Sequence, residues 1–469
     1  MTKRGWSVES LVIIFSIIVI SQLLTYVVPQ GEFERQAFRG DESALVVVPG
    51  SFEFAAAGER INLRPWHFLR AIPEGFAGAQ DVIFLIFIAG GVIAILRKSG
   101  AIDAVLHKAV DKLGASPWIL IAGCLAMFGV GSYTIGMGEE YVPLIPILVT
   151  MSLAMRMDAI VAMGMVWVPY GIGWACAGFN PFGVVIAQSI ANVPLFSGWA
   201  LRIVMMLAFL AIGFHHLYRY AIRVQRDPQS SLVAHIDYSD GFEPPADIAL
   251  TRTRIFVLLA FTAGVVFFVW GASRYQWYID ELNAVFLGIG LVSALIARIP
   301  ASETSRTFMK GAAEMTTAAL IVGFARTIEV VLSDGQIIDT IINSIANVLT
   351  TFGAEAAAVG MLVVQTICNF FIPSGSGQAF VTMPIMSPLA TLTGVPQQTA
   401  VLAYQFGDGF TNMIVPTSAL VMGALALGKI PYGAWVRFVG PLLLKLFALA
   451  VVFLVATIHL GSALGFHPA

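Results

Sequence analysis

Long apolar stretches constrain this chain more than any other feature of its sequence. A helix needs about 20 apolar residues to cross a bilayer. Stretches that approach this length cover about residues 8–28, 82–96, 199–217, 255–272, 283–298, 314–332 and 433–461. Two further apolar regions, about 117–193 and 354–428, are interrupted by glycine, proline and polar residues. The pattern predicts an all-α polytopic membrane protein.

The composition supports this class and excludes others. Of the 469 residues, 58% are hydrophobic and 12% are charged, whereas a soluble protein is about 45–50% apolar and about 25% charged. The net charge of −2 gives no basic field for a nucleic acid. The three cysteines form no CxxC pair, and no metal-ligand set accompanies them. We therefore expect the lipid bilayer as a partner, no nucleic acid and no bound metal.

The placement of lysine and arginine predicts the orientation in the membrane. Lys3 and Arg4 precede the first span, so the N-terminus is expected in the cytoplasm. The topology count is consistent only if 117–155 enters from the cytoplasm and returns there, as a re-entrant hairpin or a paired span. By the same count 354–392 enters from outside, and the C-terminus is extracytoplasmic.

These boundaries give the expected domain organisation. Residues 1–218 form a first repeat with an extracytoplasmic loop at 30–80, 219–254 are a cytoplasmic linker, and 255–469 hold an extra span and the second repeat. Alternation in Ala44–Phe54 predicts short strands. The periodic stretches 101–114 and 336–351 are expected to be helices in the membrane interface.

The two interrupted regions resemble each other. Gly136–Val142 matches Gly375–Val381, and the flanking matches keep the same order along both halves. Because one copy is expected to enter from inside and the other from outside, the repeats are predicted to be inverted. Inverted repeats with broken helices are the sequence mark of secondary transporters.

Two Gly-rich segments are the candidate hairpin tips, at Ser132–Glu140 and Pro373–Gln378. Glycine lets a ligand approach the main chain, and free amides at a helix start can hold a carboxylate. Carbonyl and hydroxyl oxygens can hold Na⁺. The alternative is a plain turn between two helices, which would leave irregular backbone at membrane depth without water.

Two candidate breaks follow, at 171–183 and 407–418. Both carry glycines and a proline, which removes a backbone donor and interrupts a helix. They are expected to be unwound near mid-membrane, although proline kinks in a packed helix are the alternative. Asp408 is the strongest ionisable candidate, because intramembrane charges are costly and usually functional. It could ligate a cation, carry a coupling proton or pair with an ammonium group.

The other charged residues within apolar stretches are expected to have structural roles. Arg326 and Glu329 are three residues apart and are expected to neutralise each other. Arg202 and Arg437 are expected to extend toward the interface. No nucleophile–base pair or cofactor motif stands out, so we expect no enzymatic activity and no cofactor beyond a coupling Na⁺ or H⁺.

Several of these motifs resemble a known group of carriers. The segments are Thr25–Arg35, Gly136–Val142, Gly178–Ala187, Pro373–Gln378 and Gln405–Asn412. They resemble the YfcC-like carriers, which group with DcuC-type C4-dicarboxylate carriers and ArcD-type basic amino-acid antiporters. The wider group is similar to the ion-transporter superfamily. The resemblance covers essentially the whole chain.

The resemblance implies a homodimer in the bacterial inner membrane, with a scaffold domain and an elevator-type transport domain. Each repeat would contribute a re-entrant helical hairpin and a broken transmembrane helix around the substrate. By motif, the substrate site comprises Gly136, Gly138, Glu139, Glu140, Asn180, Pro181, Ser374, Gly375, Ser376, Gly377, Gln378, Asn412 and Thr417. Asp408 and Glu139 are the candidates at the coupling ion. The dicarboxylate-transporter members of the wider group often carry Ser-Asn-Thr at the tips, where this chain has Pro-Ser-Gly-Ser-Gly, so their Na⁺ sites do not transfer.

The sequence therefore predicts a secondary active transporter, either an antiporter or an ion-coupled symporter, for a small charged metabolite. Glu139, Glu140 and Asp408, with few fixed cations, favour an ammonium-bearing amino acid such as arginine or ornithine. A C4-dicarboxylate is the alternative, because half-helix N-termini alone can bind carboxylates. A passive channel is the more remote alternative.

Overall fold

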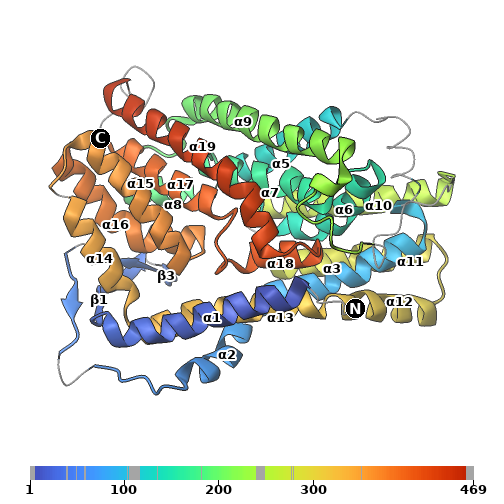
Figure 1. The fold of residues 1–469 in the computed structure, drawn as a ribbon, viewed down its shortest axis with the longest axis horizontal. Coiled ribbons are helices and arrows are strands. Elements are labelled where there is room, and N and C mark those ends of the chain that lie inside the picture. The colour runs from blue at the N-terminus through green and yellow to red at the C-terminus, as the bar shows by residue number, and fades with distance from the viewer. Residues whose placement is uncertain are drawn as a thin grey trace.

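Helices dominate the computed structural model (Figure 1). It describes residues 6–38, 41–48, 50–56, 60–102, 104, 117–134, 136–180, 182–238, 249–275, 277, 279–349 and 351–460. The first half contains α1 (Trp6–Val27), α2 (His67–Gly78), α3 (Gln80–Lys98), α5 (Trp118–Thr134), the 3₁₀ helix η1 (Glu139–Leu144), α6 (Ile145–Ala154), α7 (Ala159–Ala175), α8 (Val184–Ile190) and α9 (Trp199–Arg226).

The second half begins after a short 3₁₀ helix, η2 (Pro228–Ser230). It contains α10 (Arg252–Tyr275), α11 (Ile279–Ile296), α12 (Ala301–Glu314), α13 (Thr316–Asp334), α14 (Ile338–Leu349), α15 (Ala354–Phe371), α16 (Gly375–Thr393), α17 (Gln397–Thr411), α18 (Ala419–Leu427) and α19 (Tyr432–Leu460). Every apolar stretch expected as a span falls on a helix, namely α1, α3, α9, α10, α11, α13 and α19.

Several helices have the length and composition to cross a membrane. Among the described residues these are α9, α11, α15 and α19, and the bent pairs α2–α3 and α12–α13 would bring the number to six if each pair is one span. A multi-pass membrane protein is thus supported by length and apolarity. The first arm of the second interrupted region, α15, is itself long enough to cross.

The two halves repeat one order of elements. An apolar helix, a second helix, a buried helix, a short helix and a long helix follow one another as α5, α6, α7, α8, α9 and again as α15, α16, α17, α18, α19. In Figure 1, α5 and α6 lie in the right-hand part of the molecule and α15 and α16 in the left-hand part. The long helix α9 lies along the upper side, and α19 runs obliquely from the upper left toward the middle of the molecule.

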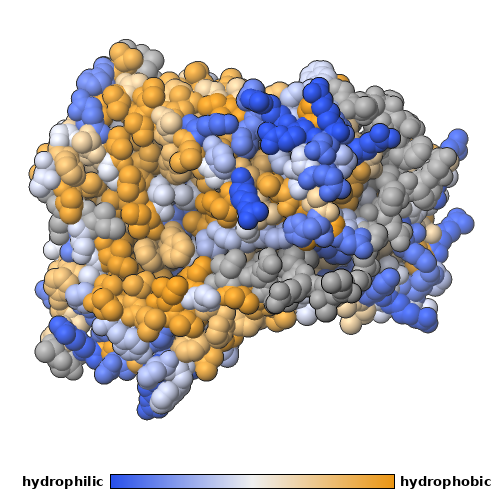
Figure 2. Space-filling view, viewed as in Figure 1, coloured by the Kyte–Doolittle hydropathy of each residue, from blue (hydrophilic) through white to orange (hydrophobic). Residues whose placement is uncertain are grey.

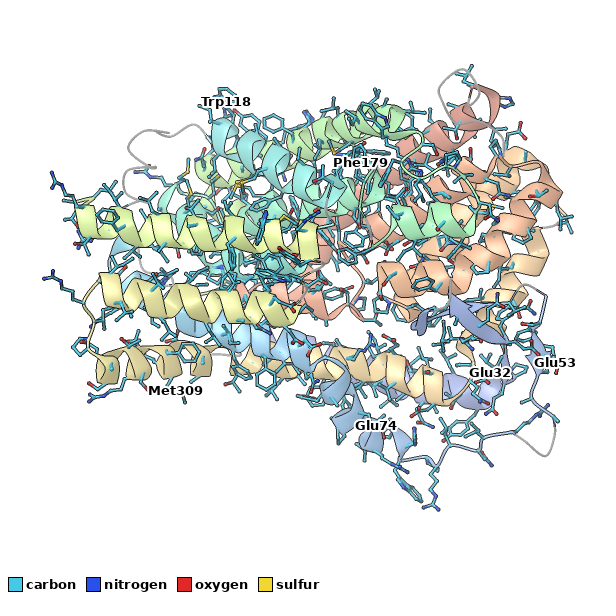
Figure 3. All side chains as sticks on the ribbon, turned by 180° about the vertical axis from the view of Figure 1, so that it is seen from behind. Glu32, Glu53, Glu74, Trp118, Phe179 and Met309 are labelled. Atoms are coloured by element: carbon cyan, nitrogen blue, oxygen red, sulfur yellow. The ribbon has the colours of Figure 1, made fainter. Side chains whose placement is uncertain are left out.

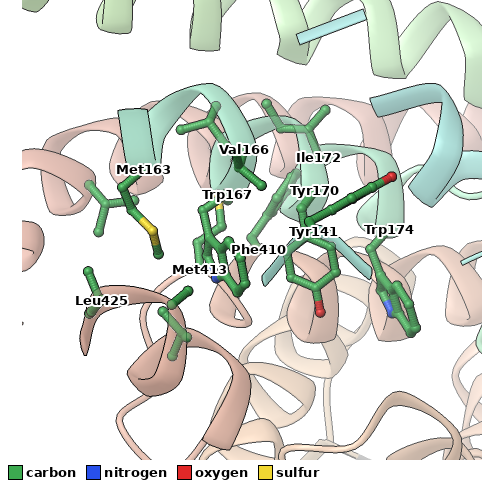
Figure 4. Packing of buried hydrophobic residues seen from close by; sticks show 14 of the residues in the cluster. Tyr141, Met163, Val166, Trp167, Tyr170, Ile172, Trp174, Phe410, Met413 and Leu425 are labelled. Carbon is green, nitrogen blue, oxygen red and sulfur yellow. The ribbon is translucent and has the colours of Figure 1, made fainter. Parts of the chain in front are cut away.

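The centre of the molecule is built from α7 and α17. Every residue of both helices is buried, and Figure 4 shows Trp167, Tyr170 and Trp174 along α7, with Phe410 of α17 beside them. A helix that is apolar all round must be surrounded by other helices. This explains why α7 shows no amphipathic pattern in the sequence. Helix α17 is equally buried but carries polar residues such as Gln405 and Asp408, which are hydrogen-bonded inside the protein.

Two glycines let the C-terminal ends of α7 and α17 touch. A β-carbon on Gly409 would lie 2.4 Å from the backbone nitrogen of Ala175, and one on Gly171 would lie 2.8 Å from the carbonyl oxygen of Gly409. Small residues allow such close backbone approach between membrane helices. The two helices therefore cross just before each of them ends.

Substitution of Gly409 by alanine is expected to destabilise the protein by roughly 1–3 kcal/mol, because the added methyl group has no space. Gly440, in α19, is the matched control, since a β-carbon there meets nothing within 4 Å. Alanine at that helical position should stabilise by roughly 0.5–1 kcal/mol. Thermal unfolding of both purified variants measures the difference, and equal melting temperatures would contradict the close crossing.

The predicted extracytoplasmic loop carries the β structure of the described chain. Strands β1 (Gly31–Glu32) and β4 (Glu53–Phe54) pair antiparallel, as do β2 (Arg35–Phe38) and β3 (Asp41–Val47). The prediction of short strands is confirmed. Figure 3 shows Glu32 and Glu53 at one end of the molecule and Met309 of α12 at the opposite end.

This segment is anchored to the second half. The Arg35 guanidinium pairs with Asp339 of α14 at 2.9 Å, and the Phe33 amide donates to the same carboxylate at 3.0 Å. The remainder of 30–80 differs from a plain loop, because α2 is helical and its Gly75 packs against Thr327 of α13. Helix α2 is therefore packed against the second half of the chain.

Two other expectations have definite outcomes. Helix α14 confirms helical structure within 336–351, while its place in the interface stays a prediction. The stretch 101–114 falls largely outside the described residues. Helix α9 continues to Arg226, so the first residues of the predicted linker at 219–254 are helical.

Candidate functional site

The first tip lies directly against the first break. Helix α5 ends at Thr134, and Gly136 adopts φ of +75°, a conformation that favours glycine. A β-carbon on Gly136 would lie 2.5 Å from Oδ1 of Asn180. The Gly138 amide donates to the Glu140 carboxylate at 2.8 Å. Gly136 therefore packs against the segment after α7, while Gly138 packs against Tyr170 within α7.

The second tip is shorter than expected. Helix α15 ends at Phe371 and α16 already begins at Gly375, so Gly375–Gln378 form a helical first turn. The Ser374 hydroxyl caps this turn by accepting from the Gly377 amide at 3.4 Å. A serine cap of this kind replaces one of the bonds missing at a helix start. Ser374, Gly375 and Ser376 of this turn border a cavity that is described below.

The breaks are also shorter than the sequence suggested. Gly171 and Gly173 belong to α7, and Gly407 and Gly409 belong to α17, so the expectation that these glycines are unwound is wrong. They serve close packing, since a β-carbon on Gly407 would lie 2.5 Å from Cβ of Gln365. Among the described residues, the non-helical segments are 176–180 with 182–183, and 412–418.

Asp408 sits one turn before the second break, inside α17 rather than at an unwound position. Its side chain is fully buried. Trp174 Nε1 donates to one carboxylate oxygen at 2.6 Å, and Asn412 Nδ2 donates to the other at 2.9 Å. Asn369 supports the arrangement by donating to the Asp408 carbonyl oxygen at 3.1 Å and to Asn412 Oδ1 at 2.8 Å.

This network joins both halves of the chain around one carboxylate. Trp174 comes from the end of α7, Asn369 from α15, and Asp408 and Asn412 from α17 and its break. A β-carbon on Gly375 at the second tip would lie 3.1 Å from Asp408 Oδ2. A buried carboxylate needs such partners, and it can also bind a small cation or a proton.

One cavity of about 650 Å³, here called the central pocket, is bordered by both tips and both breaks. Predicted site residues that line it are Gly136, Glu139, Glu140, Ser374, Gly375, Ser376, Asn412 and Thr417. Phe179 and Phe182 of the first break line it as well. The structure thus brings together tips and breaks that are more than 200 residues apart in the sequence.

The remaining predicted residues lie behind this lining. Asn180 is buried and accepts from the Phe182 amide at 2.8 Å. Gln378 ties α16 to α15 by donating to the Gln365 side chain at 2.6 Å. Gly138 and Gly377 shape the two tips, and Asp408 lies behind Trp174. Pro181 lies outside the described residues.

Sequence reasoning missed part of the lining. Asp81, Tyr170, Trp174, Trp277 and Arg326 also border the central pocket. The Arg326–Glu329 ion pair is confirmed, yet Arg326 also lines the central pocket. Its position in an apolar span was a usable signal. The aromatic residues gave no signal, because core packing explains them equally well.

The expectation for Arg202 is wrong. Its side chain is fully buried rather than extended toward the interface, whereas its repeat counterpart Arg437 is exposed. The guanidinium donates to Ala177 in the first break, to Gln398 at 3.2 Å and to Gln405. Arg202 therefore connects the first break to α17. The local sequence predicted that its charge is solvated, but hydrogen-bond acceptors about 200 residues away in the sequence take the place of water.

Comparison with known proteins identifies the family of this chain. The model of the DcuC family, described as C4-dicarboxylate anaerobic carrier, matches residues 9–459. The protein "Putative basic amino acid antiporter YfcC" of Escherichia coli (strain K12) is 32% identical over 99% of this chain and 98% of its own length. An uncharacterised protein of Haemophilus influenzae is 27% identical over 96% of each chain.

Two solved structures are more distantly similar. The YdaH transporter of Alcanivorax borkumensis has a TM-score of 0.43 and 16% identity, covering 97% of this chain and all of that chain. MtrF of Neisseria gonorrhoeae has a TM-score of 0.39 and 17% identity, covering 95% and 94% of the two chains. Since the family model matches nearly the whole sequence, the chain belongs to the DcuC family of transporters.

Proposed function

We propose that the chain is a secondary active transporter that binds a small charged solute in the central pocket and moves it by alternating access. The observation that carries this proposal is the meeting of both tips and both breaks around one cavity. Broken helices lend backbone amides and carbonyls to a solute at mid-membrane. A passive channel would not need such matched elements from two halves.

The architecture supports inverted repeats. The order of helices is the same in both halves, and the two hairpins lie toward opposite ends of the molecule in Figure 1. Residues 1–218 and 255–469 would then form the repeats, joined by the linker at 219–254. We further propose a homodimer in the inner membrane, with an elevator-type transport domain moving against a scaffold, and a cytoplasmic N-terminus opposite an extracytoplasmic C-terminus.

The charges around the central pocket support an amino acid with a cationic side chain as the substrate. Asp81, Glu139 and Glu140 outnumber Arg326 in the lining. The carboxylates would attract an ammonium or guanidinium, while Arg326 and the amides of the second tip would hold the α-carboxylate. The relative in E. coli, named as a basic amino acid antiporter, supports arginine or ornithine.

A C4-dicarboxylate is the second candidate. The family description names this class, and Arg326 offers a guanidinium that matches a carboxylate. A substrate with two carboxylates would have to approach Glu139 and Glu140 without a compensating cation of its own. We therefore place the amino acid first.

Counterflow in proteoliposomes tests both candidates. Vesicles loaded with arginine should take up labelled arginine faster than empty vesicles, because exchange returns the carrier loaded. External ornithine should compete and fumarate should not. Transport of fumarate with arginine ignored would favour the dicarboxylate, and flux that neither saturates nor accelerates with internal substrate would contradict a carrier altogether.

A further inference from the structure

A second cavity lies between the C-terminal half of α9, which is expected on the cytoplasmic side, and the first half of α19, and it shares no residue with the central pocket. It has a volume of about 390 Å³. Its lining, here called the basic groove, consists of His215, His216, Arg219, Tyr220, Arg223, Ser230, Leu232, Arg437, Phe438, Pro441 and Lys445. Four of these are permanent cations, and none of the described lining residues is a carboxylate.

The basic groove is formed by two facing rows of side chains. His215, Arg219 and Arg223 recur every four residues and therefore share one face of α9. Arg437 and Lys445 are two such steps apart on α19. Lys445 Nζ lies 3.3 Å from His216 Nδ1, and His216 Nε2 lies 2.9 Å from the Phe438 carbonyl oxygen. The rows thus meet across a contact between the two helices.

Like charges on neighbouring helices repel each other, so this arrangement calls for an anion. Guanidinium groups bind phosphate through paired hydrogen bonds, and an ammonium adds a point charge. Tyr220 and Ser230 also line the cavity, but their hydroxyl groups donate to the Asp158 carboxylate at 2.6 Å and to the Asp227 carbonyl oxygen at 2.7 Å, so the cations alone are the donors for an anion. The set of donors fits a phosphate group better than a single carboxylate, because more than two cations can each reach a different oxygen.

The surroundings suggest where such a phosphate comes from. Figure 2 shows a hydrophilic patch over the right-hand part of α9 and the adjoining α19, bordered by apolar surface. Leu207 on α9 and Leu444 on α19 are exposed, at 59% and 73%. Basic pockets between transmembrane helices at the cytoplasmic side suit anionic lipid headgroups, with the acyl chains along the apolar faces.

We propose that the basic groove is a binding site for a phosphate group, as carried by an anionic phospholipid of the cytoplasmic leaflet. Occupancy would neutralise the facing rows and hold α9 against α19. These helices are the last elements of the two repeats, so a bound lipid would bridge the halves at their cytoplasmic end.

Lipid binding to the purified full-length protein tests this proposal. Native mass spectrometry would compare phosphatidylglycerol with phosphatidylcholine for the parent protein and for the double variant Arg437→Gln/Lys445→Gln. Loss of two cations should weaken phosphatidylglycerol retention roughly 30-fold. The double variant Arg306→Gln/Lys310→Gln is the control, because it removes the same charge from exposed positions on α12.

The outcomes separate the sources of the phosphate. Retention of phosphatidylglycerol that millimolar inorganic phosphate fails to displace assigns the groove to lipid, whereas thermal stabilisation by inorganic phosphate alone assigns it to a soluble phosphate. Both require the groove variant to lose the effect and the α12 variant to keep it. Equal weakening in the two variants, or equal retention of phosphatidylcholine, would overturn the proposal.

Discussion

Replacement of Asp408 by asparagine is expected to reduce ion-driven accumulation of substrate to the level of empty liposomes. The carboxylate is fully buried and accepts hydrogen bonds from Trp174 and Asn412. An amide has nearly the same shape but no charge, so it cannot attract a coupling cation or exchange a proton. Its NH₂ group would also face one of the two donors, which leaves a buried donor unsatisfied at a cost of about 1–3 kcal/mol.

Two measurements keep this prediction distinct from misfolding. Asp280→Asn, at an exposed position on α11, removes the same charge and should transport normally. Counterflow without an ion gradient should survive in Asp408→Asn if the residue serves coupling alone, and should disappear if it also supports the substrate site. Normal ion-driven accumulation by a folded Asp408→Asn protein would remove Asp408 from the mechanism.

The network around Asp408 links coupling to substrate through few contacts. Trp174 and Asn412 touch the carboxylate and also line the central pocket. Gly375 connects the same carboxylate to the second tip, and its carbonyl oxygen accepts from the Tyr404 hydroxyl at 2.6 Å. A change in the charge of Asp408 would therefore alter the hydrogen bonds of two residues that line the central pocket, so coupling needs no chain of intermediate residues.

Much of the helical framework could be predicted from the sequence, because apolar length alone determines where a helix can cross lipid. The first tip could also be located, because its glycines indicated an irregular segment, and Gly136 does adopt a positive φ there. The extent of the breaks could not. A glycine such as Gly409 serves unwound backbone and close helix packing equally well, and only the partner helix decides between them.

The charged residues show a second limit of local reasoning. Arg202 looked like an interfacial residue because it lies near a helix end, but its partners Gln398 and Gln405 come from the other half of the chain. Arg326 has a local partner in Glu329, which explained it without the pocket. For Arg202 the deciding neighbours are distant in sequence, so no short-range pattern reveals them. For Arg326 the local ion pair concealed a signal that was present, namely a charged residue inside an apolar span.

Cysteines placed beside the two hairpins are expected to react from opposite sides of the membrane. Arg156→Cys follows α6 at an exposed position, and Leu392→Cys, which is 79% exposed, lies in the last turn of α16. In inverted repeats these points emerge on the cytoplasmic and the extracytoplasmic face, respectively. The native thiols Cys124, Cys176 and Cys368 are buried and should add little background.

An impermeant maleimide applied to intact cells should label Leu392→Cys almost fully and leave Arg156→Cys unlabelled until the membrane is opened. Two cysteines on α12, at Arg306 and Lys310, provide a cytoplasmic reference on an exposed helix at the end opposite the strands. Labelling of both hairpin positions from one side would mean that the halves are not inverted. Alternating access would then lack its symmetry, because two copies with the same orientation cannot exchange inward-facing and outward-facing conformations.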